Sequence, residues 1–184
     1  LFNLSTFQLK AMNILTAFKK ITSFVFDIDG VLTDGTVLVL PNGVQARRMH
    51  IKDGFALQMA LKNGYRVKVI SGGNSPEVLD RLTKLGVTDV HMSVLDKGTL
   101  LQEWMKTENL KKESVLYMGD DLPDLPALGV VGLPVCPADA AEEVKKVSLY
   151  ISPLKGGEAC VREVIEKVLR MNGHWEYRVD VASR

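Results

Sequence analysis

The sequence has little cysteine, almost no net charge and no long apolar run. Its two cysteines, Cys136 and Cys160, are too few for a disulfide framework and too distant for a zinc pair without histidine help, so we expect thiols in a reducing cytoplasm. A formal net charge of +1 gives no reason to expect a nucleic acid or a membrane surface as a partner. No apolar segment approaches the about 18 residues that span a bilayer. A Walker-type phosphate loop is also missing, which argues against a nucleotide hydrolase of that class.

Length and composition favour one soluble domain. The chain has 184 residues, of which 46% are hydrophobic and 24% charged. The first twenty residues lack the order of a secretory signal, so a cytoplasmic protein is expected. Apolar positions at helical spacing predict a helix over 5–20. We therefore divide the chain into a helical extension at 1–20, a core at 21–172 and a polar, flexible tail at 173–184.

Strand-like and helical patterns alternate along the core. The β-rich runs are 21–27, 65–70, 87–92, 114–118, 130–135 and 148–151. The helical patterns between and after them are 53–63, 75–85, 97–108, 122–128, 139–146 and 157–171. Such alternation predicts an α/β fold with a doubly wound parallel sheet and helices on both faces.

One segment interrupts the alternation. Residues 36–51 read as a β-hairpin around Pro41-Asn42-Gly43, directly after the loop of the first strand. A hairpin alone is marginally stable, so this one is the expected surface for self-association. Arg47 and Arg48 form a small basic patch on it, which either steers an anionic substrate or is a solvated strand face.

Two aspartates stand at the exit of the first apolar strand. In the segment DIDGVLTDG, Asp27 and Asp29 are two positions apart and Gly30 permits a sharp turn. Carboxylates beside such a strand are costly unless they are solvated or bind a cation. A plain Asp-Gly turn does not need the second aspartate, so we interpret the pair as functional.

A second acidic segment, GDDLPD, follows the strand at 114–118. Its acids, Asp120, Asp121 and Asp124, repel one another unless a metal neutralises them. Hard oxygen ligands point to Mg²⁺, with Asp120 as a direct ligand and Asp121 or Asp124 bracing the site. A helix N-cap cluster is the structural alternative. The three histidines are scattered and are interpreted as satisfied or surface groups: His50, His91 and His174.

Candidate phosphate-binding groups follow two further strands. Ser71 and Gly72 lie after the strand at 65–70 and offer a hydroxyl and backbone N–H groups. Lys97 lies near the start of a helix, the wrong end for a cation unless an anion binds there. Alone, the first would be an ordinary loop and the second a solvated lysine. Since parallel strands end at the same edge of a sheet, their joint placement favours a phosphate site.

In these residues the chain resembles the haloacid dehalogenase superfamily of phosphohydrolases, over roughly 20–170. The resemblance implies a Rossmann-like core with Asp27 as the nucleophile that forms an aspartyl-phosphate. It implies Asp29 as general acid and base. Mg²⁺ would be held by Asp27, by the backbone carbonyl of Asp29 and by Asp120. Ser71, Gly72 and Lys97 would bind the phosphoryl oxygens.

The short intervals between these motifs leave no room for a separate cap domain, so a capless member is indicated. Further segments, IKDGFALQMA, VLDRLTKLG and GGEACVRE, resemble the subfamily that hydrolyses 3-deoxy-D-manno-octulosonate 8-phosphate in lipopolysaccharide sugar synthesis. That resemblance implies a homotetramer built on the hairpins. It adds four candidate substrate residues: Arg81, Gly156, Gly157 and Arg162.

The chain departs from that subfamily at three places. Gly73 stands where an arginine facing the substrate is usual, Ala159 replaces a glycine, and Ser93 stands where glycine is common. A nine-carbon sugar-acid 9-phosphate, or another small phosphorylated metabolite, is therefore an alternative substrate. A catalytically silent oligomerising module is a third possibility. It is disfavoured because the expected catalytic set is complete: Asp27, Asp29, Lys97 and Asp120.

Overall fold

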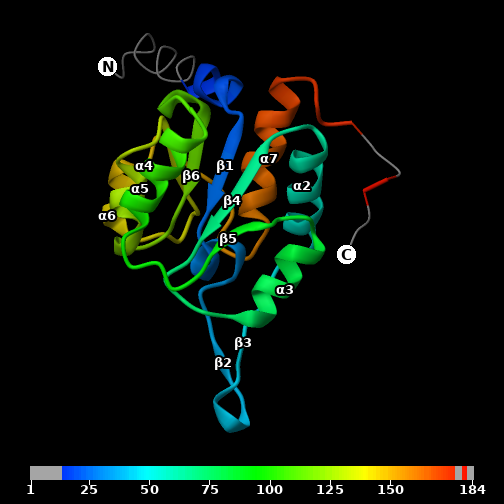
Figure 1. Ribbon diagram of the computed structural model, residues 1–184, viewed down its shortest axis with the longest axis vertical. Coiled ribbons are helices and arrows are strands. Elements are labelled where there is room, and N and C mark those ends of the chain that lie inside the picture. Colours follow the sequence, from blue (N-terminus) through cyan, green and yellow to red (C-terminus); the bar gives the residue numbers. More distant parts are fainter. Residues whose placement is uncertain (1–13, 177–179, 182–184) are drawn as a thin grey trace, which may run out of the picture.

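The computed structural model describes residues 14–176, 180 and 181, and its centre is one parallel sheet (Figure 1). All pairings in this sheet are parallel, in the order β5-β4-β1-β6-β7-β8. The strands are β1 Ser23–Phe26, β4 Arg66–Ile70, β5 Asp89–His91, β6 Val115–Met118, β7 Leu133–Cys136 and β8 Tyr150–Ile151. Every residue of β1 is buried, because helices cover both faces of the sheet. The predicted doubly wound fold is confirmed.

Two helical layers enclose the sheet. One hydrophobic cluster joins it to α2 Ile51–Lys62, α3 Pro76–Lys84 and α7 Cys160–Met171. A second cluster on the opposite face joins it to α4 Lys97–Thr107, α5 Leu125–Leu128 and α6 Glu142–Val147. Figure 1 shows the two layers on either side of the strands. The chain leaves β1 toward β4 and β5, then returns to β6 on the other side of β1. This reversal is the switch point where such sheets bind ligands.

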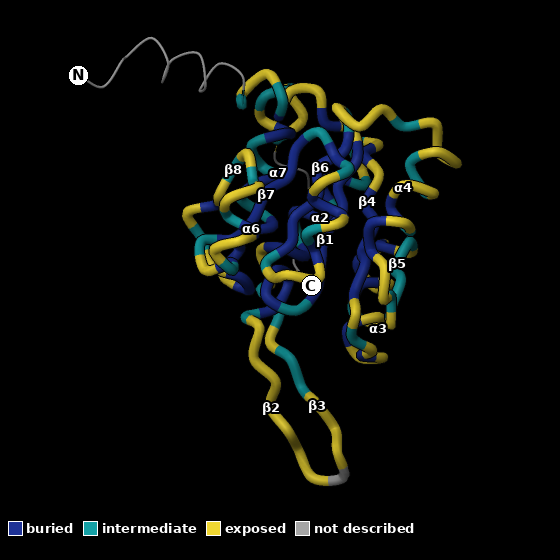
Figure 2. Tube along the Cα trace, turned by 90° about the vertical axis from the view of Figure 1, so that its left-hand side faces the viewer, coloured by how far each residue is buried: buried dark blue, intermediate teal, exposed yellow. Residues whose placement is uncertain are grey.

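The hairpin is shorter than predicted and projects from the body (Figure 2). Its strands, β2 Leu38–Val39 and β3 Gln45–Ala46, pair antiparallel over two positions each. A 3₁₀ turn at Pro41–Gly43 joins them instead of a simple Asn-Gly turn. The expected ladder over 36–51 ends early because the sequence after Ala46 turns back to the domain, where Met49 bridges Thr33.

Several predicted boundaries need correction. The strand expected at 130–135 begins at Leu133, because residues 129–132 form a turn that packs against the segment around Glu113. The helix expected at 157–171 begins at Cys160, because Gly157 and Ala159 both have positive φ. The helix expected at 122–128 is a 3₁₀ turn followed by α5, and the one expected at 139–146 begins at Glu142.

The two ends of the chain are described in part. Residues 14–20 are helical, and the rest of the helix expected over 5–20 lies outside the described residues. In the segment expected to be a flexible tail, the ring of Trp175 lies 6.1 Å from that of Phe55, and Val181 is 7% exposed against the core. Within the described part of the chain, no helix has the length and apolarity needed to cross a membrane.

Asp53 joins the N-termini of α2 and α7. Its Oδ1 accepts a hydrogen bond from the backbone N of Arg162 at 2.7 Å, while its Oδ2 is buried with no hydrogen-bond partner among the described residues. Burial raises the pKa of Asp53 to about 7, and the hydrogen bond and charge of Arg162 oppose that shift only partly. The folded state therefore binds this proton more tightly than the unfolded state does between about pH 4 and 7.

Asp53→Asn should flatten the dependence of stability on pH. In the wild type the Asp53 contribution to the free energy of unfolding falls as pH rises from about 4 to 7 and stays low above that. The difference in free energy of unfolding between Asp53→Asn and wild type should therefore shift in favour of the variant by about 1–3 kcal/mol from pH 5 to pH 8. Urea midpoints at both pH values would measure this, with the exposed Asp80→Asn as control. Equal pH responses of wild type and Asp53→Asn would contradict it.

Candidate active site

The predicted site residues converge at the carboxyl end of the central strands. Asp27 follows β1, Ser71 follows β4, Asp120 follows β6, and Lys97 begins α4. One cavity is lined by Asp27, Asp29, Gly35, Ser71, Gly72, Gly73, Lys97, Asp120, Asp121, Pro123 and Asp124. The structure thus brings together every residue expected to carry catalysis, phosphate binding or metal binding.

The loop after β1 is folded tightly against the loop after β6. Asp27 Oδ1 accepts from its neighbour Ile28 N at 2.7 Å, which fixes the carboxylate at the strand exit. Gly30 has a φ of +81°, and a Cβ built there would lie 2.0 Å from Asp120 Oδ2. Only glycine therefore allows Asp120 to approach this loop.

Lys97 is a buried member of the site rather than a solvated lysine. It is 3% exposed, and its Nζ lies 2.9 Å from Asp27 Oδ2 and 2.7 Å from Asp124 Oδ1. Asp96 caps α4 by accepting from Thr99 N, so the helix start is satisfied without the lysine. The ammonium is free to hold two carboxylates across the cavity floor.

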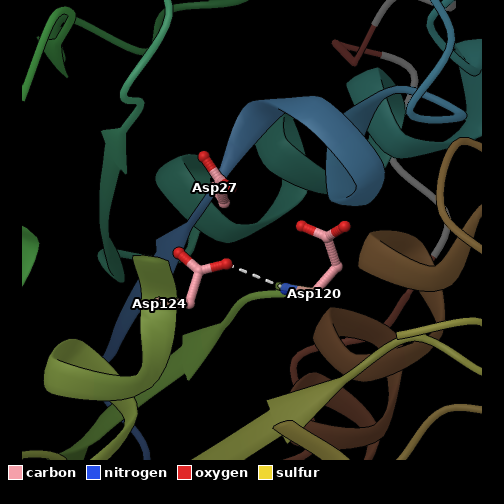
Figure 3. A group of neighbouring side chains, drawn as sticks. All are labelled: Asp27, Asp120 and Asp124. Atoms are coloured by element: carbon pink, nitrogen blue, oxygen red, sulfur yellow. Dashed lines mark hydrogen bonds between the residues drawn. The ribbon is translucent and has the colours of Figure 1, made fainter. Parts of the chain in front are cut away.

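Asp124 is held by four donors. Its Oδ1 accepts from Lys97 Nζ and, at 2.6 Å, from the hydroxyl of Tyr117. Its Oδ2 accepts from the backbone N of Asp120 at 2.9 Å, drawn in Figure 3, and from that of Asp121 at 3.3 Å. Of the two acids predicted to brace the site, Asp121 and Asp124, it is therefore Asp124 that holds the surrounding groups in place. Sequence reasoning missed Tyr117, although a tyrosine within a buried strand signals a partner for its hydroxyl.

The acids carry more negative charge than the protein compensates. Burial first, and then Asp124, raise the pKa of Asp27 to about 7 against the opposing effect of Lys97. Burial, Asp27 and Asp124 raise the pKa of Asp120 to about 8. A cation between these carboxylates would relieve the repulsion.

The cluster fits a divalent metal with a preference for oxygen. Asp27, Asp120 and Asp124 each place a carboxylate oxygen within 4.8 Å of the others (Figure 3). Because four donors already occupy Asp124, Asp27 and Asp120 are the carboxylates with capacity for the ion. The carboxylate of Asp29 turns elsewhere, so only its backbone carbonyl could contribute. Oxygen ligands without histidine or cysteine suit Mg²⁺.

Asp29 is paired with an arginine that sequence reasoning had not placed in the site. Arg47 Nε lies 2.6 Å from Asp29 Oδ1, and Nη2 lies 3.2 Å from Oδ2. The side chain of Arg47 is 7% exposed and that of Asp29 is 39% exposed. Arg48 instead pairs with Asp34 at the surface. The two arginines of the predicted patch therefore have different environments.

Backbone hydrogen bonds hold the loop at 71–73 against the loop after β5. Ser71 N donates to His91 O, Val94 N donates to Ser71 O, and Ser93 N donates to Gly73 O. The Ser71 hydroxyl accepts from Gly73 N at 3.1 Å and keeps its own proton for another acceptor. Ser93 has a φ of +56°, which explains why glycine suits this position.

Ser93→Gly should stabilise the protein by about 0.5–1 kcal/mol. Relief of the left-handed conformation, about 1–2 kcal/mol for a residue with a Cβ, exceeds the added entropy of the unfolded chain. Urea midpoints would measure the gain. Ser93→Ala is the matched control because it keeps the Cβ, and an equal gain in that variant would contradict the explanation.

The four candidate substrate residues lie outside the cavity lining of their own chain. Gly156 and Gly157 pack on the catalytic loop, where Gly157 N donates to Val31 O and a Cβ on Gly156 would meet Gly30 O at 2.0 Å. Arg162 pairs with Glu166 and lies against the rings of Phe55 and Trp175. Arg81 lines a groove between the hairpin and α3.

Comparison with known proteins gives a consistent result. Residues 83–161 match a family model described as haloacid dehalogenase-like hydrolase. The 3-deoxy-D-manno-octulosonate 8-phosphate phosphatase of Salmonella typhi is 30% identical over 161 residues, which cover 88% of this chain and 86% of the relative. That of Yersinia pestis is 32% identical over 145 residues, covering 79% of this chain and 78% of the relative.

Solved structures agree. A 3-deoxy-D-manno-octulosonate 8-phosphate phosphatase from Yersinia pestis superposes with a TM-score of 0.85 at 29% identity, covering 88% of both chains. The enzyme of that name from Moraxella catarrhalis, in complex with magnesium, phosphate and KDO, gives a TM-score of 0.83 at 32% identity and covers 86% of this chain and 91% of that chain.

Proposed function

We propose that this chain, which belongs to the haloacid dehalogenase-like hydrolases, is the phosphatase of 3-deoxy-D-manno-octulosonate 8-phosphate. Phosphate monoester hydrolysis follows from the family. The substrate is supported by relatives of that activity that match most of the chain. The observation that carries the proposal is the cavity in which Asp27, Asp29, Lys97 and Asp120 meet at the strand ends.

The first half of the reaction forms a covalent intermediate. Asp27, held by Ile28 N and Lys97 Nζ, attacks phosphorus while the bond to the sugar oxygen breaks. Asp29 gives a proton to the departing sugar oxygen. Ser71 and Lys97 stabilise the negative oxygens of the transferring group. Mg²⁺ held by Asp27, Asp120 and the Asp29 carbonyl would neutralise charge that otherwise repels the nucleophile from the phosphate.

The second half restores the enzyme. Asp29 accepts a proton from a water, whose oxygen attacks the phosphorus of the aspartyl-phosphate. The bond between Asp27 and phosphorus breaks, and inorganic phosphate leaves. Both protons pass through Asp29, which lies on the cavity wall two residues after the nucleophile.

Self-association through the hairpin belongs to the same proposal. Its exposed apolar side chains are Val37, Leu38, Val39, Leu40 and Val44. Such a concentration on a two-stranded projection favours burial against other copies, and a homotetramer is the assembly we propose. Light scattering after size exclusion should report four chains, and Leu38→Lys with Val39→Lys should yield smaller species. A monomeric wild type would exclude the assembly.

Phosphate release from three substrates tests the reaction. We expect fast release from 3-deoxy-D-manno-octulosonate 8-phosphate with MgCl₂, little with EDTA, and slower release from a nine-carbon sugar-acid 9-phosphate and from p-nitrophenyl phosphate. If the nine-carbon compound proves the better substrate, the assignment moves to that acid. If no substrate releases phosphate with Mg²⁺, the phosphatase assignment itself fails.

A further inference from the structure

Arg47 contacts the predicted general acid through both of its oxygens. The guanidinium approaches Asp29 in a fork, with Nε at 2.6 Å from Oδ1 and Nη2 at 3.2 Å from Oδ2. Oδ1 also accepts from the hydroxyl of Thr33 at 3.4 Å. In this arrangement both oxygens of Asp29 are engaged, Oδ1 by two donors and Oδ2 by one. Asp29 must exchange at least one partner before it can reach a leaving group.

The pair is asymmetric in its exposure. The arginine side chain is 7% exposed, whereas the aspartate side chain is 39% exposed and lines the cavity. A buried guanidinium is costly without an anion beside it, because its hydration is lost. Arg47 therefore cannot simply release Asp29. It needs another acceptor with the planar, two-oxygen geometry that the arginine fork fits.

Arg47 lies where the part of a substrate beyond its phosphate would extend. Asp29 and Gly73 line the phosphate cavity, whereas Arg47, Ser75, Glu77 and Arg81 line a groove, and the pair between Arg47 and Asp29 joins the two linings. A Cβ on Gly73 would lie 3.3 Å from Asp29 Oδ2 and 3.8 Å from Arg47 Nη2. Because Gly73 has no side chain, the position beside Asp29 Oδ2 and Arg47 Nη2 where its Cβ would lie is left unfilled by that residue.

The groove offers charges of both signs. Glu77 is the other acid whose charge acts on Arg47, and Arg81 is a second cation on the same lining. Among the described residues, Arg47 donates side-chain hydrogen bonds to Asp29 alone. A carboxylate entering between Gly73 and the groove would thus meet a guanidinium whose present partner belongs to the catalytic machinery.

We propose that Arg47 binds a carboxylate of the substrate and, by giving up Asp29 in exchange, releases the general acid for catalysis. The proposal rests on the proposed function, in which the substrate is a sugar acid. One carboxylate replaces another on the same fork, so the exchange retains the bidentate pair. A phosphate ester without a carboxylate leaves Asp29 bound to Arg47. Arg47 is therefore a specificity residue that couples recognition of the acid to the freedom of Asp29.

The test compares two substrates in Arg47→Gln, Arg47→Lys and wild type. With 3-deoxy-D-manno-octulosonate 8-phosphate, Arg47→Gln should lower kcat/KM by about 30-fold or more, the scale of lost hydrogen bonds to a charged group. With p-nitrophenyl phosphate, which has no carboxylate, the Arg47→Gln variant should turn over faster than wild type because Asp29 is no longer held by Arg47. Arg47→Lys keeps the charge without the fork and should fall between. Arg48→Gln, beside it on the surface, is the matched control.

Two results would overturn the inference: an equal loss with both substrates, which makes Arg47 part of the phosphoryl chemistry, or no loss with the sugar acid. A wild type that does not hydrolyse the sugar-acid phosphate would instead refute the proposed substrate. In that case p-nitrophenyl phosphate alone decides. Faster turnover of p-nitrophenyl phosphate in Arg47→Gln supports the inference that Arg47 restrains Asp29, and unchanged or slower turnover contradicts it. Urea midpoints of all variants control for folding.

Discussion

Asp27→Asn should abolish turnover while making the folded protein more stable. A carboxamide is a poor nucleophile toward phosphorus, so the turnover number should fall by on the order of 10⁴-fold or more. The carboxylate it replaces has a pKa raised to about 7, chiefly by burial. Above that pH the charge on Asp27 costs folding free energy, and its removal should add about 1–2 kcal/mol at pH 8 without metal.

The two effects of Asp27→Asn need separate measurements. Phosphate release with Mg²⁺ gives the activity, and an acid quench should trap a phosphorylated protein in wild type and none in the variant. Urea unfolding in EDTA at pH 8 gives the stability, with Asp80→Asn as the surface control. Residual turnover near the wild-type rate would show that another group attacks phosphorus. A large loss of stability would show that Asp27 is a structural ion-pair partner first.

Lys97→Met should damage activity and stability together. Lys97 Nζ is the shared partner of Asp27 and Asp124, and both carboxylates are buried. Its removal leaves these charges uncompensated, which should cost about 3–5 kcal/mol without metal. The transferring phosphoryl group also loses a cation, so kcat/KM should fall by on the order of 10³-fold.

Mg²⁺ provides the diagnostic for Lys97→Met. Since the deficit is excess negative charge, added MgCl₂ should raise the urea midpoint of the variant by more than that of wild type. Lys84→Met, at an exposed pair with Asp80, is the control and should change neither quantity appreciably. If Lys97→Met and wild type unfold at the same urea concentration in EDTA, the pairing of Lys97 with Asp27 and Asp124 does not stabilise the fold as its distances indicate.

Much of the fold and site follows from local pattern. Buried β-rich runs separated by helical periodicity specify a parallel sheet, and parallel strands end at one edge. Asp27, Ser71 and Asp120 therefore had to approach one another wherever the exact boundaries fell. Lys97 was predicted to bind phosphate because of its place in the order of the motifs along the chain. Their catalytic roles stay predictions, and the Asp27 and Lys97 variants test two of them.

The features that the sequence did not predict depend on which side chains the folded chain brings into contact. Arg47 and Arg48 are adjacent and chemically alike, yet the turn after β3 buries one against Asp29 and leaves the other at the surface. No local pattern separates them. The same holds for Tyr117, whose partner Asp124 is fixed only when the loop after β6 folds back. Hairpin length was overestimated because its alternation continues where its pairing stops.

The four donors on Asp124 also bear on which ion the site accepts. With that carboxylate withheld, the protein offers few oxygens to a cation. Ca²⁺ needs about six to eight ligands at longer distances, whereas Mg²⁺ keeps several waters and accepts one or two carboxylates. The hydrogen bonds that Tyr117 and the backbone amides of Asp120 and Asp121 donate to Asp124 would thus act as a filter on ionic size. Discrimination between Mg²⁺ and Ca²⁺ would arise because the carboxylate of Asp124 is not available as a ligand to the ion.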